Sequence, residues 1–228
     1  TDIMEETCGA RLTMNYMVPG GVVADIHPNF QKRVKDFIKL FKSKIHEYDE
    51  LVTGNIIFQN RMKNVGILTA EDAISYGCTG PVARGSGVSS DIRKIHPYEI
   101  YDKLEFDEVL ETGCDSFSRY QVRMKEMHQS IRIVEQLVDN IPDGEFQAKT
   151  KAVLKLPKGE FYSRVETARG ELGVYIVSEG GTTPYRIKFR SPGFSNLSAL
   201  DHMVRGSKIG DLMATMGTLD LVIPDIDR

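Results

Sequence analysis

Cysteine is scarce in this sequence of 228 residues, which contains only Cys8, Cys78 and Cys114. The three lie far apart along the chain, and no Cys-x-x-Cys pair is present. Disulfide frameworks, zinc sites and iron–sulfur clusters usually depend on closely spaced cysteines. The cysteine pattern therefore disfavours all three within this chain and is typical of a protein from a reducing compartment.

Long apolar runs and an excess of positive charge are absent as well. No apolar run approaches the roughly 18 residues needed to cross a bilayer, and the first residues lack the basic start of a signal peptide. The 29 lysines and arginines are outnumbered by 32 aspartates and glutamates, which gives a net charge of -3. A nucleic-acid partner is therefore not expected. With 41% hydrophobic and 27% charged residues, the composition predicts a folded globular protein.

The beginning of the chain has the pattern of a helix that is nearing its end. Residues 1–8 are compatible with a helix, and Gly9 stands where a helix commonly terminates. We therefore expect the 228 residues to be the C-terminal piece of a longer polypeptide. Their number corresponds to one large domain or two small ones.

Two long amphipathic helices are expected, over residues 29–52 and 116–140. In both segments the apolar residues recur with the helical period on one face. Gly54 follows the first segment and Pro142 the second, and both residue types end helices. Shorter helices are predicted over residues 57–63 and 70–76, the latter with Thr69 as its N-cap.

Residues 77–97 form a glycine-rich loop between these helices. Gly77, Gly80, Gly85 and Gly87 allow a close approach of the backbone to another group. The loop matches neither the GxxxxGK[ST] nor the GxGxxG phosphate-binding pattern, and Ser86 lacks the setting of a hydrolase nucleophile. A structural loop buried against another element is therefore the favoured interpretation.

The last third of the chain predicts an antiparallel three-stranded meander over residues 161–168, 171–178 and 184–190, because tight glycine-containing connections join the runs. Short helices are expected over residues 195–205 and 207–216, followed by an extended stretch over 219–223. The fold class is therefore α+β, with long helices first and the sheet late. We divide the chain into a helical core region, 1–141, and a segment with the meander and the C-terminus, 142–228.

Asp220 is the chemically unusual residue of this last segment, because it interrupts the apolar run 219–223. A carboxylate buried there must be paired or have a raised pKa. One interpretation is structural, in which Asp220 caps residues 216–218 or pairs with an arginine; the other is a functional carboxylate. The five histidines show no spacing typical of a helical metal pair, so no metal site is predicted.

Several sequence blocks occur in a fixed order along the chain. They are Gly9-Ala10-Arg11, Thr69-Ala70-Glu71-Asp72-Ala73, Arg84-Gly85-Ser86-Gly87, Asp91-Ile92-Arg93-Lys94, Gly170-Glu171-Leu172-Gly173-Val174-Tyr175, Pro192-Gly193-Phe194 and Asp225-Ile226-Asp227-Arg228. Together they resemble the hydrophilic quinone-site core subunit (the D subunit) of respiratory complex I, the NADH:quinone oxidoreductase, over essentially all 228 residues. That family is related to the large subunit of NiFe-hydrogenase, so the resemblance implies part of that fold.

The resemblance also implies a function. A family member helps to form the cavity where quinone is reduced, with Asp220, Val222 and Arg228 at positions of the cavity. A 4Fe-4S cluster held by the cysteines of a neighbouring subunit supplies the electrons, and Arg11 and Thr13 match positions close to it. The implied partners are this cluster-bearing subunit, other complex I subunits including the membrane arm, and quinone. The implied location is peripheral, on the cytoplasmic side of the bacterial inner membrane, and the complex couples electron transfer from NADH to proton translocation.

The sequence departs from the family pattern in ways that leave alternatives open. The paired-histidine loop and the tyrosine expected to contact quinone lie before residue 1, so the fragment is expected to be inactive alone. It is either part of the enzyme or a purely structural and interaction module, while the absence of cysteine in 220–228 disfavours a hydrogenase-like metalloenzyme. Thr13 stands where many members have a histidine, whose protonation could raise the potential of the cluster when it is reduced. We therefore hypothesise a cluster with a lower and less pH-dependent potential, consistent with a low-potential quinone such as menaquinone. A strongly pH-dependent potential in a redox titration of the complex would contradict this hypothesis.

Overall fold

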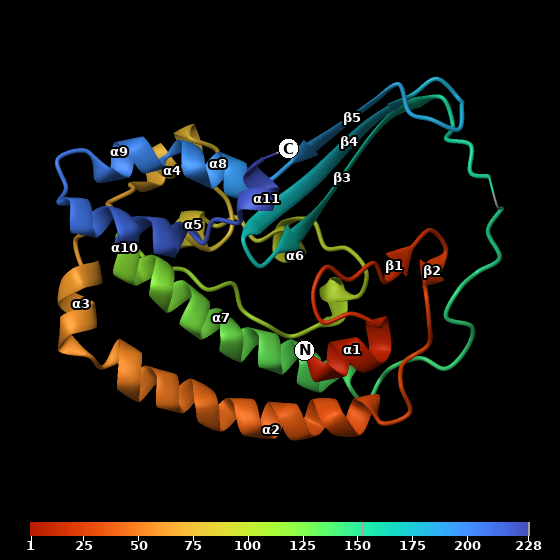
Figure 1. Cartoon of the computed structure of the whole chain (residues 1–228), viewed down its shortest axis with the longest axis horizontal. Helices are drawn as coiled ribbons and strands as arrows, with labels where there is room; N and C mark the ends of the chain where they lie inside the picture. Colours follow the sequence, from red (N-terminus) through yellow and green to blue (C-terminus); the bar gives the residue numbers. More distant parts are fainter. Residues whose placement is uncertain (152, 228) are drawn as a thin grey trace.

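The computed structural model describes residues 1–151 and 153–227 (Figure 1). The longer helices are α2 (Phe30–Tyr48), α7 (Ser116–Leu137) and α10 (Ile209–Leu219). The shorter ones are α1 (Asp2–Cys8), α3 (Ile56–Met62), α4 (Ala70–Ser75), α5 (Pro81–Arg84), α6 (Ile92–Ile95), α8 (Pro192–Ser198), α9 (Leu200–Val204) and α11 (Ile223–Ile226), with a π-helix at Asp49–Thr53 and a 3-10 helix at Tyr101–Lys103. The strands are β1 (Met17–Val18), β2 (Gly21–Val22), β3 (Gly159–Thr167), β4 (Gly170–Ser178) and β5 (Arg186–Arg190). The predicted α+β class is confirmed.

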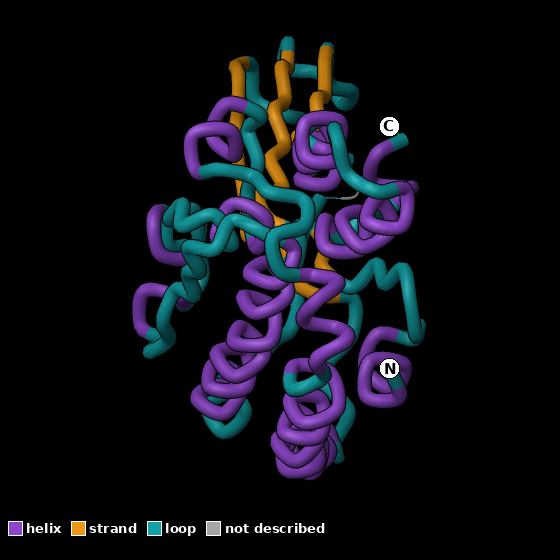
Figure 2. Tube along the Cα trace, turned by 90° about the vertical axis from the view of Figure 1, so that its left-hand side faces the viewer, coloured by secondary structure: helices purple, strands orange, loops and turns teal. Residues whose placement is uncertain are grey.

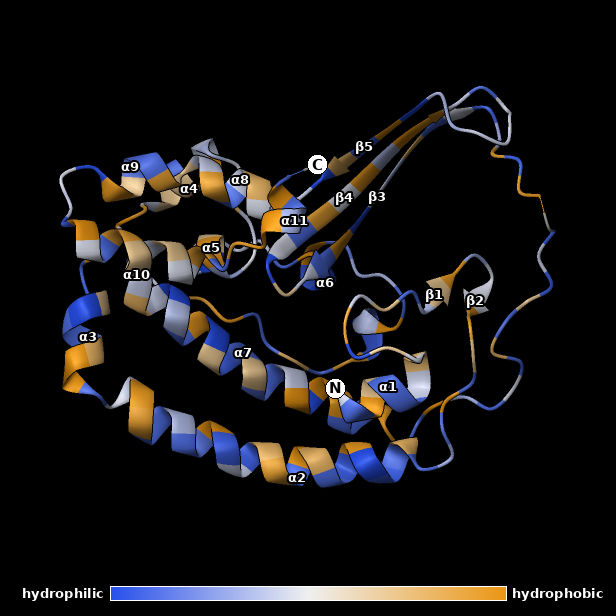
Figure 3. Cartoon of the chain, viewed as in Figure 1, coloured by the Kyte–Doolittle hydropathy of each residue, from blue (hydrophilic) through white to orange (hydrophobic). Residues whose placement is uncertain are grey.

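Helices α2 and α7 pack against each other along their apolar faces. A cluster of buried side chains joins them: Val34, Ile38 and Ile45 from α2, Met124 and Ile131 from α7, and Val138 just after it. Apolar and polar residues alternate along α2, as expected for the helical period (Figure 3). The expectation of two long amphipathic helices is therefore confirmed. No helix among the described residues is long and apolar enough to cross a membrane.

The start of two short helices is fixed by side-chain caps. The side chain of Asn55 accepts a hydrogen bond from the backbone N–H of Ile57, at 2.8 Å, at the start of α3. The Thr69 hydroxyl accepts one from the backbone N–H of Asp72, at 3.1 Å, at the start of α4. Such caps satisfy N–H groups that have no partner within the helix. The predicted N-cap role of Thr69 is confirmed.

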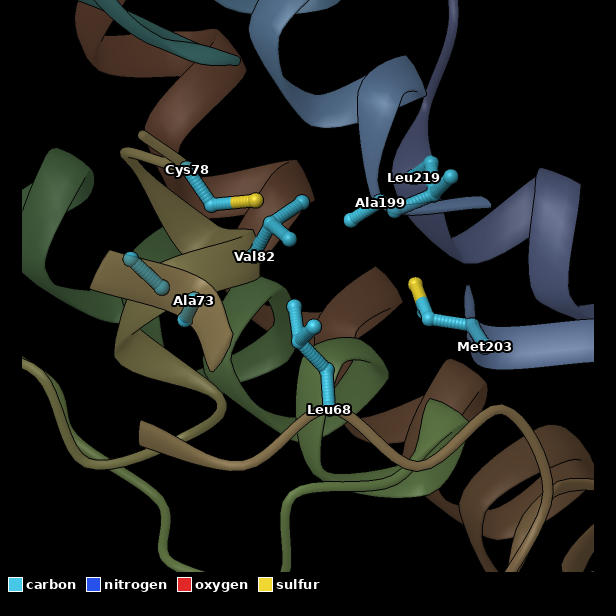
Figure 4. Packing of buried hydrophobic residues seen from close by; sticks show 8 residues of the cluster. Leu68, Ala73, Cys78, Val82, Ala199, Met203 and Leu219 are labelled. Atoms are coloured by element: carbon cyan, nitrogen blue, oxygen red, sulfur yellow. The ribbon is translucent and has the colours of Figure 1, made fainter. Parts of the chain in front are cut away.

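A second buried cluster lies between the α4–α5 region and the C-terminal helices (Figure 4). It consists of Leu68, Ala73, Cys78, Val82, Ala83, Ala199, Met203 and Leu219. The Cys78 thiol lies inside this apolar cluster, and burial raises its pKa to about 11, so it stays protonated and unreactive. The cluster joins residues from both sides of position 141, and the division at that position stays a prediction.

Strands β3, β4 and β5 form an antiparallel meander, as predicted (Figure 2). Gly170, the first residue of β4 after the turn from β3, has a positive φ of 132°, and an added Cβ would lie 2.6 Å from the Thr79 hydroxyl. Glycine is therefore required where this turn packs against the glycine-rich loop. The base of the meander is fixed to the helical part of the molecule by this contact.

The prediction of an extended stretch over residues 219–223 is wrong. Helix α10 continues to Leu219, and Asp220 then takes a left-handed conformation with φ 54°. Only Leu221 and Val222 separate this cap from helix α11, whose second residue is Pro224. Proline is well tolerated in the first turn of a helix, because the N–H groups there have no partner within the helix. The apolar pattern typical of a strand was therefore produced by the meeting of two helix ends.

Candidate functional site

The glycine-rich loop is buried against α7 and the base of the meander, as its composition suggested. A Cβ at Gly80 would lie 2.5 Å from the carbonyl oxygen of Arg169, and a Cβ at Gly85 would lie 2.8 Å from Cγ of Arg119. These contacts leave no room for larger side chains at the two glycines. The loop thereby brings Arg84, at the end of α5, into the interior of the molecule.

Arg84 is the centre of a buried ion network. Only 1% of its side chain is exposed, and its Nε donates a 2.8 Å hydrogen bond to Glu126 of α7 while Nη1 donates one of 2.8 Å to Glu166 of β3. Burial lowers the pKa of Arg84, but the two carboxylates outweigh it, and the pKa lies above its usual value. Burial also raises the pKa of Glu166 despite the opposing effect of Arg84. One guanidinium thus holds two carboxylates in a nearly water-free position.

Asp91 and Arg93 form a second pair beside this network. Arg93 binds the Asp91 carboxylate through Nε, at 2.9 Å, and Nη2, at 2.7 Å, while the same carboxylate caps α6 through the backbone N–H of Arg93. Burial raises the pKa of Asp91, but Arg93 outweighs it and the pKa is lowered overall. The Arg93 guanidinium also lies 5.0 Å from the centre of the Phe106 ring. The Asp91–Arg93 pair is therefore held in a fixed orientation beside the Arg84 network.

Arg84, Glu126, Glu166 and Arg93 line a cavity of about 390 Å³ to which α5, α6, α7 and the end of β3 contribute. The lining residues are Arg84, Arg93, Tyr101, Arg123, Glu126, Met127, Ser130, Glu166, Thr167, Ala168 and Asp220. We call this space the charged cavity. Its volume lies in the range typical of small-molecule sites.

Asp220 lies at the charged cavity and is paired with Arg169. Nη2 of Arg169 is 3.3 Å from Oδ1 of Asp220, and Nε donates a 3.0 Å hydrogen bond to its backbone carbonyl oxygen. Asp220 is therefore paired with an arginine, as one of the two interpretations expected, while its functional role stays a prediction. Its side chain is 39% exposed, however, so the carboxylate is less buried than the apolar sequence around it predicted.

The other predicted site residues are distributed differently. Val222 lines a neighbouring cavity of about 290 Å³, to which Arg169 and Thr167 also contribute. Arg228 lies outside the described residues. Arg11 and Thr13 are exposed after α1, where Arg11 pairs with Asp2 at 2.7 Å, and neither lines these two cavities. Among the described candidates, Asp220 and Val222 thus line two cavities that share Thr167, whereas Arg11 and Thr13 line neither.

Apart from Asp220, the residues that line the charged cavity were missed as site residues at the sequence level. The charged ones and the tyrosine are Arg84 on α5, Arg93 on α6, Arg123 and Glu126 on α7, Glu166 on β3, and Tyr101. A usable signal was present on α7, because Arg119, Arg123 and Glu126 are spaced by four and three residues and so lie on one helix face. Charged residues on one side of a helix that also has an apolar stripe are normally taken as solvent-facing, which hid this signal.

Potential metal ligands are dispersed in the part of the chain that the structure describes. No group of three or more histidine, cysteine, aspartate or glutamate side chains there is placed to hold a metal ion. His46 lies 3.3 Å from Glu50, and His202 lies 3.3 Å from Asp72, each as a simple pair. The residues present therefore do not fit an iron–sulfur cluster or a nickel site.

Comparison with known proteins identifies the class to which this fold and cavity belong. Residues 1–155 and 150–228 match the family described as the 49 Kd subunit of respiratory-chain NADH dehydrogenase. The chain belongs to this family. The relatives are more specific, because they are named as the D or the fused C/D subunit of NADH-quinone oxidoreductase.

The similarity extends over the whole chain. The chain is 54% identical over 227 residues to the C/D subunit from Bacteroides thetaiotaomicron. This alignment covers 100% of the chain and 43% of the relative. The chain is 47% identical to the D 2 subunit from Solibacter usitatus and 46% identical to the D subunit from Desulforamulus reducens, covering 99% of this chain in both cases and 61% and 62% of these relatives. The chain therefore spans about half of the length of the curated relatives that it matches.

Proposed function

We propose that this chain forms part of the quinone-reduction site of an NADH-quinone oxidoreductase. The observation that carries the proposal is the position of Asp220, whose carboxylate lines the charged cavity and is oriented by Arg169. The names of the relatives supply the substrate, because quinone is the acceptor in an NADH-quinone oxidoreductase. Val222, in the adjoining cavity, and Arg228 belong to the same proposed site.

Reduction of quinone to quinol takes up two electrons and two protons. A 4Fe-4S cluster held by a neighbouring subunit close to Arg11 and Thr13 would supply the electrons. Negative charge develops on the quinone oxygens as electrons arrive, and fixed charges in a site that excludes water stabilise it effectively. We assign the proton transfer to Asp220, whose partly exposed carboxylate lines the charged cavity. In the whole complex this reaction is coupled to proton translocation.

The second candidate function is that of an interaction module for other subunits. Two neighbouring helices support it, because Ile209 and Met213 of α10 are 90% and 71% exposed, and Ile56 and Ile57 of α3 are 64% and 70% exposed. Apolar side chains gathered in this way are typical of surfaces that contact another protein. The partners in this proposal are the cluster-bearing subunit and the membrane arm, with the chain at the cytoplasmic side of the membrane.

Substitution of Asp220 in the intact complex tests the proposed function. Asp220→Asn keeps the size of the side chain but removes its charge and its ability to take up a proton at neutral pH. We expect NADH:quinone reductase activity to fall about 100-fold or more, the effect typical of losing a proton-transfer group. NADH oxidation by a hydrophilic artificial acceptor, which does not use the quinone site, should stay unchanged.

Asp201→Asn is the matched control, because Asp201 is an exposed aspartate paired with Arg205 on the surface. It should change neither activity. If Asp220→Asn behaves like this control, Asp220 is a purely structural partner of Arg169 and the proposed quinone site is wrong.

A further inference from the structure

Arg123 on α7 differs from the other guanidinium groups around the charged cavity. Each of the others is paired with carboxylates: Arg84 with Glu126 and Glu166, Arg93 with Asp91, and Arg169 with Asp220. Arg123 forms no such ion pair within residues 1–151 and 153–227, although it lines the same cavity. Its guanidinium therefore has hydrogen-bond donors that the described residues do not use.

The hydrogen bonds of Arg123 are incomplete. Nη1 donates a 3.0 Å hydrogen bond to the carbonyl oxygen of Arg119, but Nε and Nη2 are buried and have no hydrogen-bond partner among the described residues. Burial lowers the pKa of Arg123, and the nearby Asp220 opposes this effect. A buried donor without an acceptor is costly, and more so when it carries a charge. An acceptor from outside the described residues would remove this cost.

The charges around the cavity indicate what kind of acceptor fits. Three guanidinium groups, Arg84, Arg93 and Arg123, and three carboxylates, Glu126, Glu166 and Asp220, line the cavity. Because the formal charges balance, an anionic ligand would add an uncompensated charge. A neutral ligand with carbonyl oxygens keeps the balance and still satisfies the donors. Met127 and Ala168 provide apolar wall for the rest of such a ligand.

We propose that Arg123 is a substrate-binding residue that donates hydrogen bonds from Nε and Nη2 to a carbonyl oxygen of the quinone head group. This inference rests on the proposed function. Binding requires a rotation of the guanidinium toward the cavity, since both nitrogens are covered in this conformation. A guanidinium in this position stabilises the negative charge that develops on the oxygen during reduction more than it stabilises the neutral carbonyl. Arg123 therefore accelerates the reaction in addition to binding the substrate.

The test uses the intact complex with Arg123→Gln and Arg123→Lys. The glutamine removes the charge, whereas the lysine keeps the charge but loses the planar pair of donors. The matched control is Arg132→Gln, because Arg132 lies on the same helix and forms exposed pairs with Glu105 and Asp107. We measure kcat and KM for a water-soluble short-chain quinone, together with NADH oxidation by a hydrophilic artificial acceptor.

We expect Arg123→Gln to lower kcat/KM for quinone about 10- to 100-fold, through both parameters, with a smaller loss for the lysine variant. Activity with the artificial acceptor and all activities of the Arg132 control should be unchanged. Normal kcat and KM in both Arg123 variants would overturn the inference and assign the space beside Arg123 to water. If Arg123→Gln does not assemble, an unchanged KM in Arg123→Lys is the overturning result.

The failure of this inference is distinguishable from failure of the proposed function. If Asp220→Asn loses quinone reductase activity while the Arg123 variants stay normal, the quinone site stands and Arg123 does not contact the substrate. If neither position affects the reaction, both proposals are wrong.

Discussion

Two regions along α7 contain buried arginines with opposite kinds of partner. In the first, which we call the arginine clamp, the fully buried Arg119 donates to neutral oxygens: 3.1 Å to the hydroxyl of Thr218 on α10, 2.9 Å to that of Ser116, and 2.8 Å to the carbonyl of Gly66. Burial and the neighbouring Arg123 lower the pKa of Arg119 to about 10. The charged cavity lies one to two turns further along α7. There, Arg84 of α5 donates hydrogen bonds to the carboxylates of Glu126 and Glu166.

We interpret the difference as separating a structural role from the proposed functional one. The arginine clamp joins α7, α10 and the loop before α4 through hydrogen bonds that satisfy the side chain, and this fixes the packing of the helices. The charged cavity contains opposite charges, open volume and a guanidinium with unsatisfied donors. A region of that kind is costly for stability but suited to a ligand that develops charge. Three substitutions test whether this distinction holds, and they are ordered by the size of the expected effect.

Arg84→Met has the largest expected effect. It leaves the carboxylates of Glu126 and Glu166 close together without their shared cation, and Glu166 has a side chain only 3% exposed. Removing one partner from a buried ion network costs about 3–5 kcal/mol of folding free energy. Thermal inactivation of the intact complex should therefore occur at a clearly lower temperature. Arg205→Met, which removes an exposed pair with Asp201, is the control and should leave this temperature unchanged.

Arg119→Met should have the next largest effect, about 2–4 kcal/mol of folding free energy, because it leaves buried neutral acceptors without their donor. The same thermal inactivation measurement applies. Complexes that remain folded should keep their KM for quinone, since the arginine clamp is separate from the charged cavity. A changed KM with unchanged thermal stability would break the comparison between the two regions.

Glu166→Gln has the smallest expected effect on stability of the three substitutions. This effect should be least at acidic pH and should grow as the pH rises. The pKa of Glu166 is raised in the folded protein above the ordinary value of 4.5, because burial outweighs the contribution of Arg84. The folded state therefore binds the proton more tightly than the unfolded state. The stabilisation linked to this proton is complete below pH 4.5 and is lost as the pH rises through the folded value.

The measurement is denaturant or thermal stability of wild type and Glu166→Gln between about pH 4 and 8, the range over which a raised carboxyl pKa is expressed. Subtracting the stability of the variant from that of the wild type at each pH cancels the contribution of all other titrating groups that the substitution leaves unchanged. The wild type should lose stability relative to the variant as the pH rises. A relative gain would mean that Arg84 outweighs burial at this position.

Local features of the sequence predicted most of the secondary structure. The periodic apolar residues of α2 and α7, the N-cap Thr69, the tight turn at Gly170 and the glycine-rich loop were all recognisable. Each depends on interactions between residues within a few positions of one another, so the sequence contains the necessary information. The short run around Asp220 was misinterpreted, because a strand and two meeting helix ends have the same apolar composition there.

The charged cavity was less predictable, because its contacts join distant parts of the chain. Arg84 and Glu166 are 82 residues apart, and Arg169 and Asp220 are 51 residues apart. The sequence singled out Asp220 as an anomaly and offered an arginine as its partner, but it did not identify which arginine. No local pattern singled out Arg123, Glu126 and Glu166 as site residues.

The sequence by itself thus determined the helices, the meander and the family of this protein, because these follow from local patterns and from blocks of residues in a fixed order. Only the tertiary structure decided which of its arginines are satisfied and which is not. The physical reason is that hydrogen-bond donors and charges are satisfied in three dimensions, by side chains that packing brings together from α5, α7, β3 and the end of α10. Arg119 and Arg123 are the same residue type four positions apart, and their surroundings alone make one a clamp and the other a candidate binding residue for quinone.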